Sequence, residues 1–157
     1  MSWSKHENIR NASHWISRKI ELIEKKDYQK QNKINPTIHR GGIFNVELGN
    51  GNIGSEKNKT RPCLVLSGNQ LNGGDTVLII PLSSKFKFNI VNGIKIPAYK
   101  NHYLLYKSKY SFLNADSCVK FEDIRCVDKV RINNFLGNVE LSDLSKMESR
   151  LKFTFGF

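Results

Sequence analysis

Three kinds of side chain that can act on a phosphate group lie at the ends of predicted β-strands, and the first is an arginine. Arg61 stands directly before Pro62, at the start of the apolar run Pro62–Ser67. Proline fixes its own φ and favours an extended conformation in the preceding residue, so we expect Arg61 to project from a rigid strand start. A guanidinium keeps its charge and binds two phosphate oxygens at once. This position therefore suits the binding of an oxyanion.

A pair of hydroxyls and a carboxylate stand at comparable positions. Ser83 and Ser84 end the third apolar run of the chain, and Glu122 lies in the predicted strand Ser117–Ile124 on the same face as Lys120. A hydroxyl can hydrogen-bond a phosphate oxygen, and a carboxylate can accept a proton. Purely structural alternatives stay open, with Arg61 in an ion pair with Glu56 or Glu47, Ser83 capping a turn, and Glu122 paired with Arg125 or Lys120.

Other catalytic signals are missing from the sequence. It has no Walker loop, dinucleotide fingerprint, metalloprotease helix motif or nucleophile elbow, and its four histidines are scattered. The odd number and wide spacing of Cys63, Cys118 and Cys126 argue against a disulfide framework and a zinc site. Cys63 and Cys118 lie within apolar runs and are expected in the core. We expect neither a metal ion nor a cofactor.

The charge balance indicates a polyanionic partner. The chain has 157 residues, a net charge of +11 and 25 Lys and Arg against 14 Asp and Glu. Such a surplus of basic residues favours nucleic acid as the partner, with an acidic protein second and an anionic membrane third. The alternative is that the positive charge only maintains solubility. The longest apolar run, Val77–Leu82, is too short to span a bilayer, so we expect a cytoplasmic protein.

Periodicity predicts two parts of the chain. Ile16, Ile20 and Ile23 recur with helical spacing within a predicted helix Asn11–Gln31, which Asn11 or Ser13 caps. Residues 1–38 are therefore predicted to be a helical extension with its linker, and residues 39–157 a separate domain. Within that domain, short apolar or alternating runs at 42–48, 62–67, 76–83, 94–98 and 117–124 predict a small, strongly bent β-barrel.

A second helix is predicted at the end of the chain. Ser142 is a suitable N-cap, and Leu144, Met147 and Leu151 follow with helical spacing. We expect the apolar tail, formed by Phe153, Phe155 and Phe157, to be buried against the barrel or a second subunit.

The order of several motifs resembles the MazF/PemK family of toxins. The resembling segments cover residues 40–157, and they are Arg40-Gly41-Gly42-Ile43-Phe44, Gly54-Ser55-Glu56, Thr60-Arg61-Pro62-Cys63-Leu64-Val65-Leu66, Ile80-Pro81-Leu82-Ser83 and Asp123-Ile124-Arg125-Cys126-Val127-Asp128-Lys129. The resemblance implies an SH3-like barrel of the MazF/PemK/CcdB type, here with a C-terminal helix and an N-terminal helical arm. It also implies a homodimer that an acidic antitoxin neutralises.

The same resemblance implies a sequence-specific, metal-independent endoribonuclease, an mRNA interferase of a type II toxin–antitoxin system. Such an enzyme cleaves single-stranded RNA by attack of the 2′-OH and leaves 2′,3′-cyclic phosphate and 5′-OH ends. The family's catalytic Arg, Thr and late acidic residue match Arg61, Ser83 and Glu122. One branch has a histidine where this chain has Ser55, which makes a histidine role doubtful here.

Predicted RNA contacts lie in the two loops that flank these residues and on the late strand. They are Ser55, Glu56, Lys57, Lys59, Thr60, Ser84, Lys85, Lys87 and Lys120. Aromatic side chains interleaved with lysines in 86–110 are candidates either for stacking on bases or for the core. Two other functions stay open: a non-catalytic barrel that binds nucleic acid or an acidic protein, and a gyrase-inhibiting toxin of the related fold.

Overall fold

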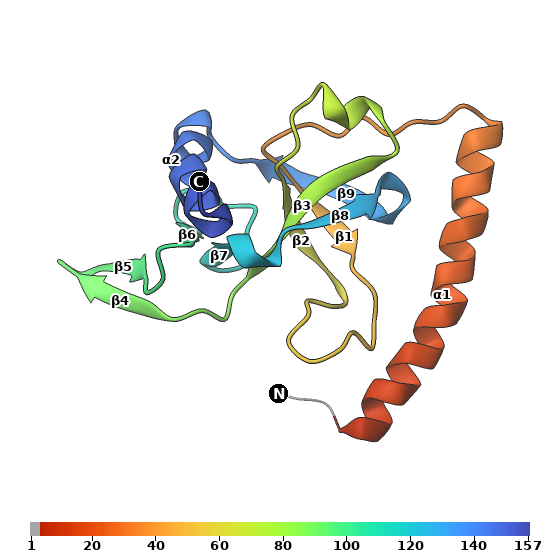
Figure 1. Cartoon of the computed structure of the whole chain (residues 1–157), viewed down its shortest axis with the longest axis horizontal. Helices are drawn as coiled ribbons and strands as arrows, with labels where there is room; N and C mark the ends of the chain where they lie inside the picture. The colour runs from red at the N-terminus through yellow and green to blue at the C-terminus, as the bar shows by residue number, and fades with distance from the viewer. Residues whose placement is uncertain (1–3) are drawn as a thin grey trace.

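A computed structural model describes residues 4–157 as a long N-terminal helix, a strongly bent antiparallel sheet and a C-terminal helix (Figure 1). Residues 1–3 of the predicted extension lie outside the described residues. The helices and strands are α1 (Lys5–Gln31), β1 (Gly42–Glu47), β2 (Thr60–Val65), β3 (Thr76–Ser83), β4 (Phe88–Val91), β5 (Ile94–Pro97), β6 (His102–Leu105), β7 (Ser117–Lys120), β8 (Arg125–Asp128), β9 (Ile132–Asn138) and α2 (Leu141–Phe155). Three 3₁₀ turns, η1 (Leu71–Gly73), η2 (Phe121–Asp123) and η3 (Lys129–Arg131), complete the described elements.

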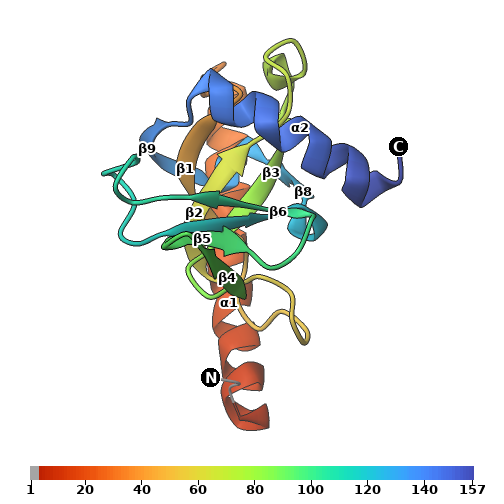
Figure 2. The same cartoon turned by 90° about the vertical axis from the view of Figure 1, so that its left-hand side faces the viewer.

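Strand β3 is the centre of the sheet. The strand order is β6-β7-β3-β2-β1-β9, and β8 also pairs with β3. One edge of β3 pairs with β2, while β8 and then β7 pair along the other edge. Figure 2 shows β6 and β7 crossing the direction of β1, β2 and β3. The predicted mainly β fold is confirmed, but no hydrogen-bonded pair within residues 4–157 joins β9 to β6, so the sheet is not closed into a barrel.

The central strands are buried on both faces, as their apolar runs predicted. Leu64 and Ile80 belong to the cluster that packs against α2, whereas Cys63 and Ile79 belong to a second cluster on the opposite face. Cys63 and Cys118 are buried and carry free thiols, as expected. Burial raises the pKa of each thiol to about 12. Neither thiol is therefore a ready nucleophile.

Four strands were not predicted, namely β4, β6, β8 and β9, because each is short or carries polar residues without clean alternation. The β4–β5 hairpin did have a local signal: Asn92 and Gly93 both adopt positive φ, 49° and 75°, the conformation of a tight hairpin turn. The predicted strand Ser117–Ile124 ends early. The strand stops at Lys120, and the turn η2 follows it. Phe121, the first residue of this turn, is fully buried in the core.

Helix α1 differs from its prediction in its start. It begins at Lys5, where Ser4 and Glu7 form a reciprocal capping box, rather than at Asn11 or Ser13. The isoleucine stripe faces solvent, and Leu22 on the opposite side is the buried position. Polar contacts determine which face docks: Lys26 forms ion pairs with Asp75 and Asp128, each at 3.1 Å. Neither helix within residues 4–157 is long and apolar enough to cross a bilayer.

Helix α2 covers one face of the sheet. Leu144 and Met147 are buried, as predicted. The helix begins one residue before the proposed cap Ser142, at Leu141, and no side chain caps its first turn. Of the two alternatives for the apolar tail, packing against the barrel is wrong, because Phe153, Phe155 and Phe157 are 57%, 52% and 92% exposed. Burial against a second subunit stays a prediction.

A buried carboxylate fastens α2 to the sheet. Asp143 accepts hydrogen bonds from the hydroxyl of Tyr103 at 2.9 Å, from Lys109 Nζ at 3.0 Å and from the hydroxyl of Tyr110. Burial alone would raise the pKa of Asp143, but the three donors outweigh it and hold the pKa below the ordinary value of 3.8. The ionised form is therefore the one that the fold stabilises.

We expect Asp143→Asn to lower the free energy of unfolding at neutral pH by about 1–3 kcal/mol, since a buried charge-assisted network loses its acceptor. A group with a lowered folded-state pKa stabilises above its unfolded-state pKa and loses this contribution as the pH falls. The wild type should therefore lose more stability than the variant between neutral pH and pH values below 3.8. Urea unfolding at several pH values measures this, with Glu148→Gln, on the exposed side of α2, as the control. Equal acid sensitivity in the two proteins would contradict the assignment.

Candidate active site

Arg61 lies at the start of β2 and carries no carboxylate partner. It faces Val46 in the β1–β2 register, and its side chain is half-buried. Its Nε donates to the carbonyl of Asn58 at 2.9 Å. Within residues 4–157 no Asp or Glu forms an ion pair with Arg61, because Glu47 pairs with Arg18 and Glu56 accepts from the backbone N–H of Ile53. The terminal guanidinium nitrogens have no carboxylate to neutralise them.

Ser83 is the last residue of β3, the strand that pairs with β2. Cys63 and Pro81 form the last pair of the β2–β3 register on this side, and Arg61 and Ser83 each lie two residues beyond it. Because side chains alternate along a strand, Arg61 shares the face of Cys63, and Ser83 shares the face of Pro81. The Ser83 hydroxyl donates to the carbonyl of Lys85 at 2.8 Å and is largely buried. Its oxygen lone pairs can still accept a hydrogen bond, and a rotation of the hydroxyl would turn its proton to a ligand.

Arg125 is a second cation at this place that sequence reasoning did not select. It faces Ile79 in the β3–β8 register, on the face of the sheet that also carries Cys63. Its Nη1 donates to the carbonyl of Lys57 at 3.4 Å, and Lys57 forms an ion pair with Asp123 at 3.3 Å. These contacts tie the β1–β2 loop to the chain around η2. The only sequence signal for Arg125 was its place in the Asp123–Lys129 motif.

Glu122 is not on a strand. It lies in η2, so the predicted shared strand face with Lys120 is wrong, and neither Lys120 nor Arg125 pairs with it. Instead the carboxylate accepts from Asn101 Nδ2 at 2.6 Å and lies 2.8 Å from His102 Nε2. The His102 ring is buried, and its Nδ1 has no hydrogen-bond partner within residues 4–157. The histidine was missed because only the β6–β7 register, which pairs His102 with Lys120, brings it to this place.

A pocket of about 550 Å³ surrounds this carboxylate and is rich in cations. Lys85 and Lys87 reach it from the segment that follows Ser83, and Lys120 reaches it from β7. Tyr99 contributes an exposed aromatic face, with Lys87 Nζ 6.0 Å from the ring centroid. The full lining is Lys85, Phe86, Lys87, Tyr99, Asn101, His102, Lys120 and Glu122. Positive charge beside an aromatic ring suits an unpaired nucleotide.

The other predicted RNA contacts are distributed over separate surfaces. Ser55 and Glu56 are exposed on the β1–β2 loop. Lys59 and Thr60 line a different pocket, beside α1, and Ser84 lines a third one with Lys95 and Lys107. Among the interleaved aromatics, Tyr110 is buried and hydrogen-bonded to Asp143, so it belongs to the core.

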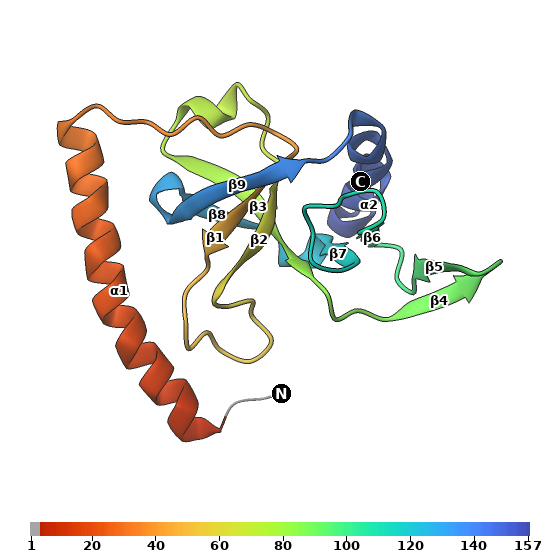
Figure 3. The ribbon, with the colours of Figure 1, turned by 180° about the vertical axis from the view of Figure 1, so that it is seen from behind.

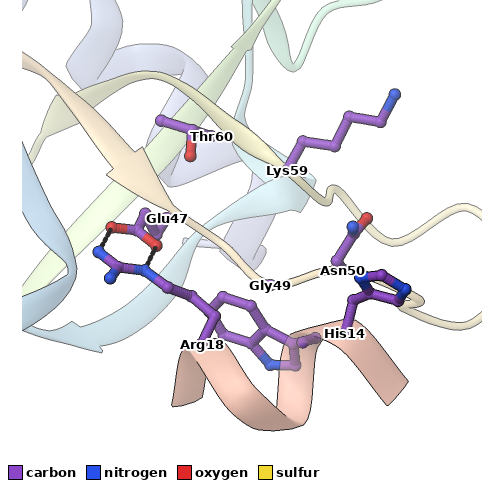
Figure 4. Close-up of a pocket in the computed structure, with 8 residues that line it drawn as sticks. His14, Arg18, Glu47, Gly49, Asn50, Lys59 and Thr60 are labelled. Carbon is purple, nitrogen blue, oxygen red and sulfur yellow. Dashed lines mark hydrogen bonds and ion pairs between the residues drawn. The ribbon is translucent and has the colours of Figure 1, made fainter. Parts of the chain in front are cut away.

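Helix α1 braces the loop that precedes Arg61. Figure 4 shows Arg18 reaching from α1 to Glu47, with Nε and Nη2 each 2.8 Å from a carboxylate oxygen. This guanidinium lowers the pKa of Glu47. At the other end of the contact, Gly51 has φ +74°, and a Cβ there would come within 2.8 Å of Ala12. Helix α1 therefore contacts the chain at Glu47, where the β1–β2 loop begins, and again at Gly51 within the loop.

Comparison with known proteins gives the class of protein. Residues 39–155 match the family of PemK-like, MazF-like toxins of type II toxin–antitoxin systems, and the chain belongs to this family. A search of curated protein sequences finds no match. Within residues 4–157, no group of three or more His, Cys, Asp or Glu side chains is arranged to hold a metal ion.

Solved structures share the fold at low sequence identity. MazF from Deinococcus radiodurans is 20% identical with a TM-score of 0.59, covering 78% of this chain and 99% of that one. An endoribonuclease in complex with its cognate antitoxin from Mycobacterial species is 19% identical with a TM-score of 0.58, covering 76% and 96%. The Mycobacterium tuberculosis toxin MazF-mt6 is 14% identical with a TM-score of 0.57, covering 74% and 97%. The division of this chain at residue 38 stays a prediction.

We expect Arg18→Ala to loosen the β1–β2 loop, because Glu47 then loses a bidentate partner. The stability loss should be about 1–2 kcal/mol, limited by solvent screening at the half-exposed Arg18. Hydrogen exchange of residues 49–60 measures the local effect. The control is Lys19→Ala, an exposed position of the same helix. Unchanged exchange in the loop would show that α1 does not brace it.

Proposed function

We propose that this toxin is a sequence-specific, metal-independent endoribonuclease that cleaves single-stranded RNA, and mRNA in the cell. The single observation that carries the proposal is the placement of Arg61 and Ser83, each two residues beyond the last β2–β3 pair, with no carboxylate within residues 4–157 paired to Arg61. Family membership supports it, and so do the fold neighbours that are themselves endoribonucleases.

RNA supplies its own nucleophile, the 2′-OH next to the scissile phosphate. In the proposed reaction this oxygen attacks phosphorus, the bond to the 5′-oxygen of the next nucleotide breaks, and a 2′,3′-cyclic phosphate forms. Arg61 stabilises the extra negative charge of the transition state, and Ser83 hydrogen-bonds a phosphate oxygen. The leaving 5′-oxygen takes up a proton and becomes a 5′-OH.

Glu122 is the proposed general base for the 2′-OH. Its carboxylate lies at the rim of the cationic pocket, and the hydrogen bonds from Asn101 and His102 hold it in one orientation. His102 acts as a positioning residue because its Nε2 faces Glu122 and its ring is buried. Lys85, Lys87 and Lys120 bind the phosphates on either side of the cut.

Incubation of the purified protein with a long RNA in EDTA tests the reaction class. Discrete cuts with 2′,3′-cyclic phosphate and 5′-OH ends are expected, at a recurring short sequence. A substrate with one deoxyribose at the cut position should stay intact there, because it lacks the nucleophile. Cleavage of that substrate would overturn the mechanism, and RNA that shifts in mobility without being cut would favour a binding module instead.

We expect Arg61→Ala to lower the cleavage rate by about 10²–10³-fold or more, since one charge-stabilising donor is lost from the transition state. The free energy of unfolding should change little, because this guanidinium makes only one hydrogen bond within residues 4–157. Single-turnover cleavage measures the rate, with Arg40→Ala, an exposed arginine outside the site, as the control. Wild-type activity in Arg61→Ala would remove the mechanism.

We expect Glu122→Gln to lower kcat while RNA affinity stays near that of the wild type, because the amide keeps the volume but cannot take a proton. Single-turnover cleavage and an RNA-binding assay check this, with Glu148→Gln as a matched surface control. An unchanged kcat would assign Glu122 to binding or structure.

A homodimer and an antitoxin are further parts of the proposal. The exposed aromatic tail, Phe153, Phe155 and Phe157, is the expected contact with a second subunit. An antitoxin with an acidic segment would suit the net charge of +11 and the lysines of the pocket. An endoribonuclease from Mycobacterial species was solved with its cognate antitoxin, and MazF from Deinococcus radiodurans was also solved as a MazE-MazF complex.

A further inference from the structure

A pocket at the base of the β4–β5 hairpin lies beside the segment that follows Ser83. Figure 3 shows this hairpin extending from the sheet on the side opposite α1. The pocket, which we call the hairpin pocket, measures about 420 Å³, and its lining includes Ser84, Phe86, Phe88, Lys95, Lys107 and Asp116. Because Ser84 directly follows Ser83, the hairpin pocket begins about 3.8 Å along the backbone from the hydroxyl proposed to bind the scissile phosphate.

The hairpin pocket and the pocket around Glu122 lie on either side of the segment 84–88. Lys85 and Lys87 line the pocket around Glu122, whereas Ser84 and Phe88 line the hairpin pocket, and Phe86 borders both. An RNA strand that crosses this segment therefore has one pocket on each side of it, and each pocket is large enough to be considered for one nucleotide. The pocket around Glu122 is already assigned to the general base and to phosphate-binding lysines.

Two aromatic rings form a wall of the hairpin pocket. The rings of Phe86 and Phe88 have their centroids 5.8 Å apart and are tilted by 58°. Phe88 is 44% exposed, and Lys95 Nζ lies 5.4 Å from the centroid of its ring. The hydroxyl of Tyr106 donates to the carbonyl of Lys95, which fastens the hairpin to the chain after β6. An exposed ring in a fixed position is a surface on which an unpaired base stacks.

A carboxylate stands among the cations of the hairpin pocket. Asp116 is the only acidic residue of the segment 85–120, which carries seven lysines. Its side chain is 28% exposed, and its two oxygens accept from the backbone N–H of Lys107 at 2.9 Å and from Lys95 Nζ at 3.3 Å. These two donors hold the pKa of Asp116 below its ordinary value of 3.8. Each oxygen has a second lone pair for a ligand.

The chemistry of this carboxylate selects among the bases. An acid repels phosphates, so its place in a basic pocket points to contact with a base edge. An unpaired base exposes its Watson–Crick edge. Guanine has two adjacent donors there, N1–H and the N2 amino group, and they match the two oxygens of a carboxylate. Uracil has one donor between two carbonyls, while adenine and cytosine each place a ring nitrogen acceptor beside their amino group.

We propose that the hairpin pocket binds an unpaired guanine next to the scissile phosphate. Phe88 stacks on the base, Asp116 accepts from N1–H and from the N2 amino group, and the Lys95 ammonium donates to O6. The inference rests on the proposed function for its substrate, single-stranded RNA, and it adds the base that the toxin selects. Phe88 and Asp116 determine specificity here and take no part in the transfer of protons or of the phosphoryl group.

Binding of RNA that cannot be cut tests the pocket without the reaction. Seven-nucleotide strands of 2′-fluoro uridine lack the attacking 2′-OH, and their central position carries guanosine, inosine, adenosine, cytidine or uridine. We expect the full-length wild type to bind the guanosine strand about tenfold more tightly than the uridine strand, within the range of a bidentate base contact. Inosine, which lacks the N2 amino group, should be intermediate. Fluorescence anisotropy of labelled strands measures the dissociation constants.

Two variants separate base selection from stacking. Asp116→Asn keeps one oxygen for the Lys107 N–H, so the preference for guanosine over uridine should vanish while uridine binding does not fall, which also shows that the variant is folded. Phe88→Ala should weaken binding of all five strands by a similar factor, about tenfold, because stacking tolerates every base. Asp27→Asn, at an exposed position of α1, is the matched control.

Three results would overturn the proposal. The first is equal affinity of the wild type for all five strands, and the second is a guanosine preference that survives in Asp116→Asn. The third is a preference for cytidine above guanosine, because it would assign the carboxylate to a single amino group.

Cut sites on a long RNA separate this inference from the proposed function. We expect guanosine next to each cut, and Asp116→Asn should relax this position while it still cleaves. A guanosine preference in binding by a protein that cuts nothing would leave the pocket valid and overturn the reaction. Cuts without guanosine beside them would overturn the pocket and leave the reaction valid.

Discussion

The antiparallel ladder between β2 and β3 is the constraint on which the site depends. Both strands are buried on both faces, so a slip by one residue would turn every core side chain to the wrong side of the sheet. The register that pairs Cys63 with Pro81 is thereby fixed by packing. Because Arg61 and Ser83 each lie two residues beyond the last pair of this ladder, the apolar core positions two polar groups that it does not itself contain.

Polar contacts carry this order outward into the loop before Arg61. The loop is held at three places: by Arg18 on Glu47, by Arg125 on the carbonyl of Lys57, and by Asp123 on the Lys57 ammonium. Loops are ordinarily the mobile part of a binding site, and mobility at a charged side chain weakens its effect on a transition state. Here a helix outside the toxin-family region supplies one of the three attachments.

Many acidic side chains of this basic protein form ion pairs and hydrogen bonds with other residues of the same chain. Asp143 binds two tyrosines and a lysine, and Asp75 and Asp128 bind Lys26. Within residues 4–157 no ion pair joins Lys85, Lys87 or Lys120 of the pocket to a carboxylate, so positive charge is concentrated around the pocket between the end of β3 and η2. This distribution, more than the total of +11, is what suits a polyanion.

Local residue patterns determined the fold class, the three longest early strands, the C-terminal helix and the positions of Arg61 and Ser83 at strand ends. These features follow from apolar periodicity and from the φ restriction at Pro62, which act over a few residues. The tertiary structure alone decided that His102 meets Glu122, that Arg125 joins the site and that Glu122 lies on a 3₁₀ turn, because strand pairing over 20 or more residues of separation creates those contacts. It also decided which face of α1 is buried. The isoleucine periodicity predicted the helix but not its buried face. Long-range ion pairs of Lys26 and Arg18 hold the side away from the isoleucines, and helical spacing contains no information about partners that lie elsewhere in the chain.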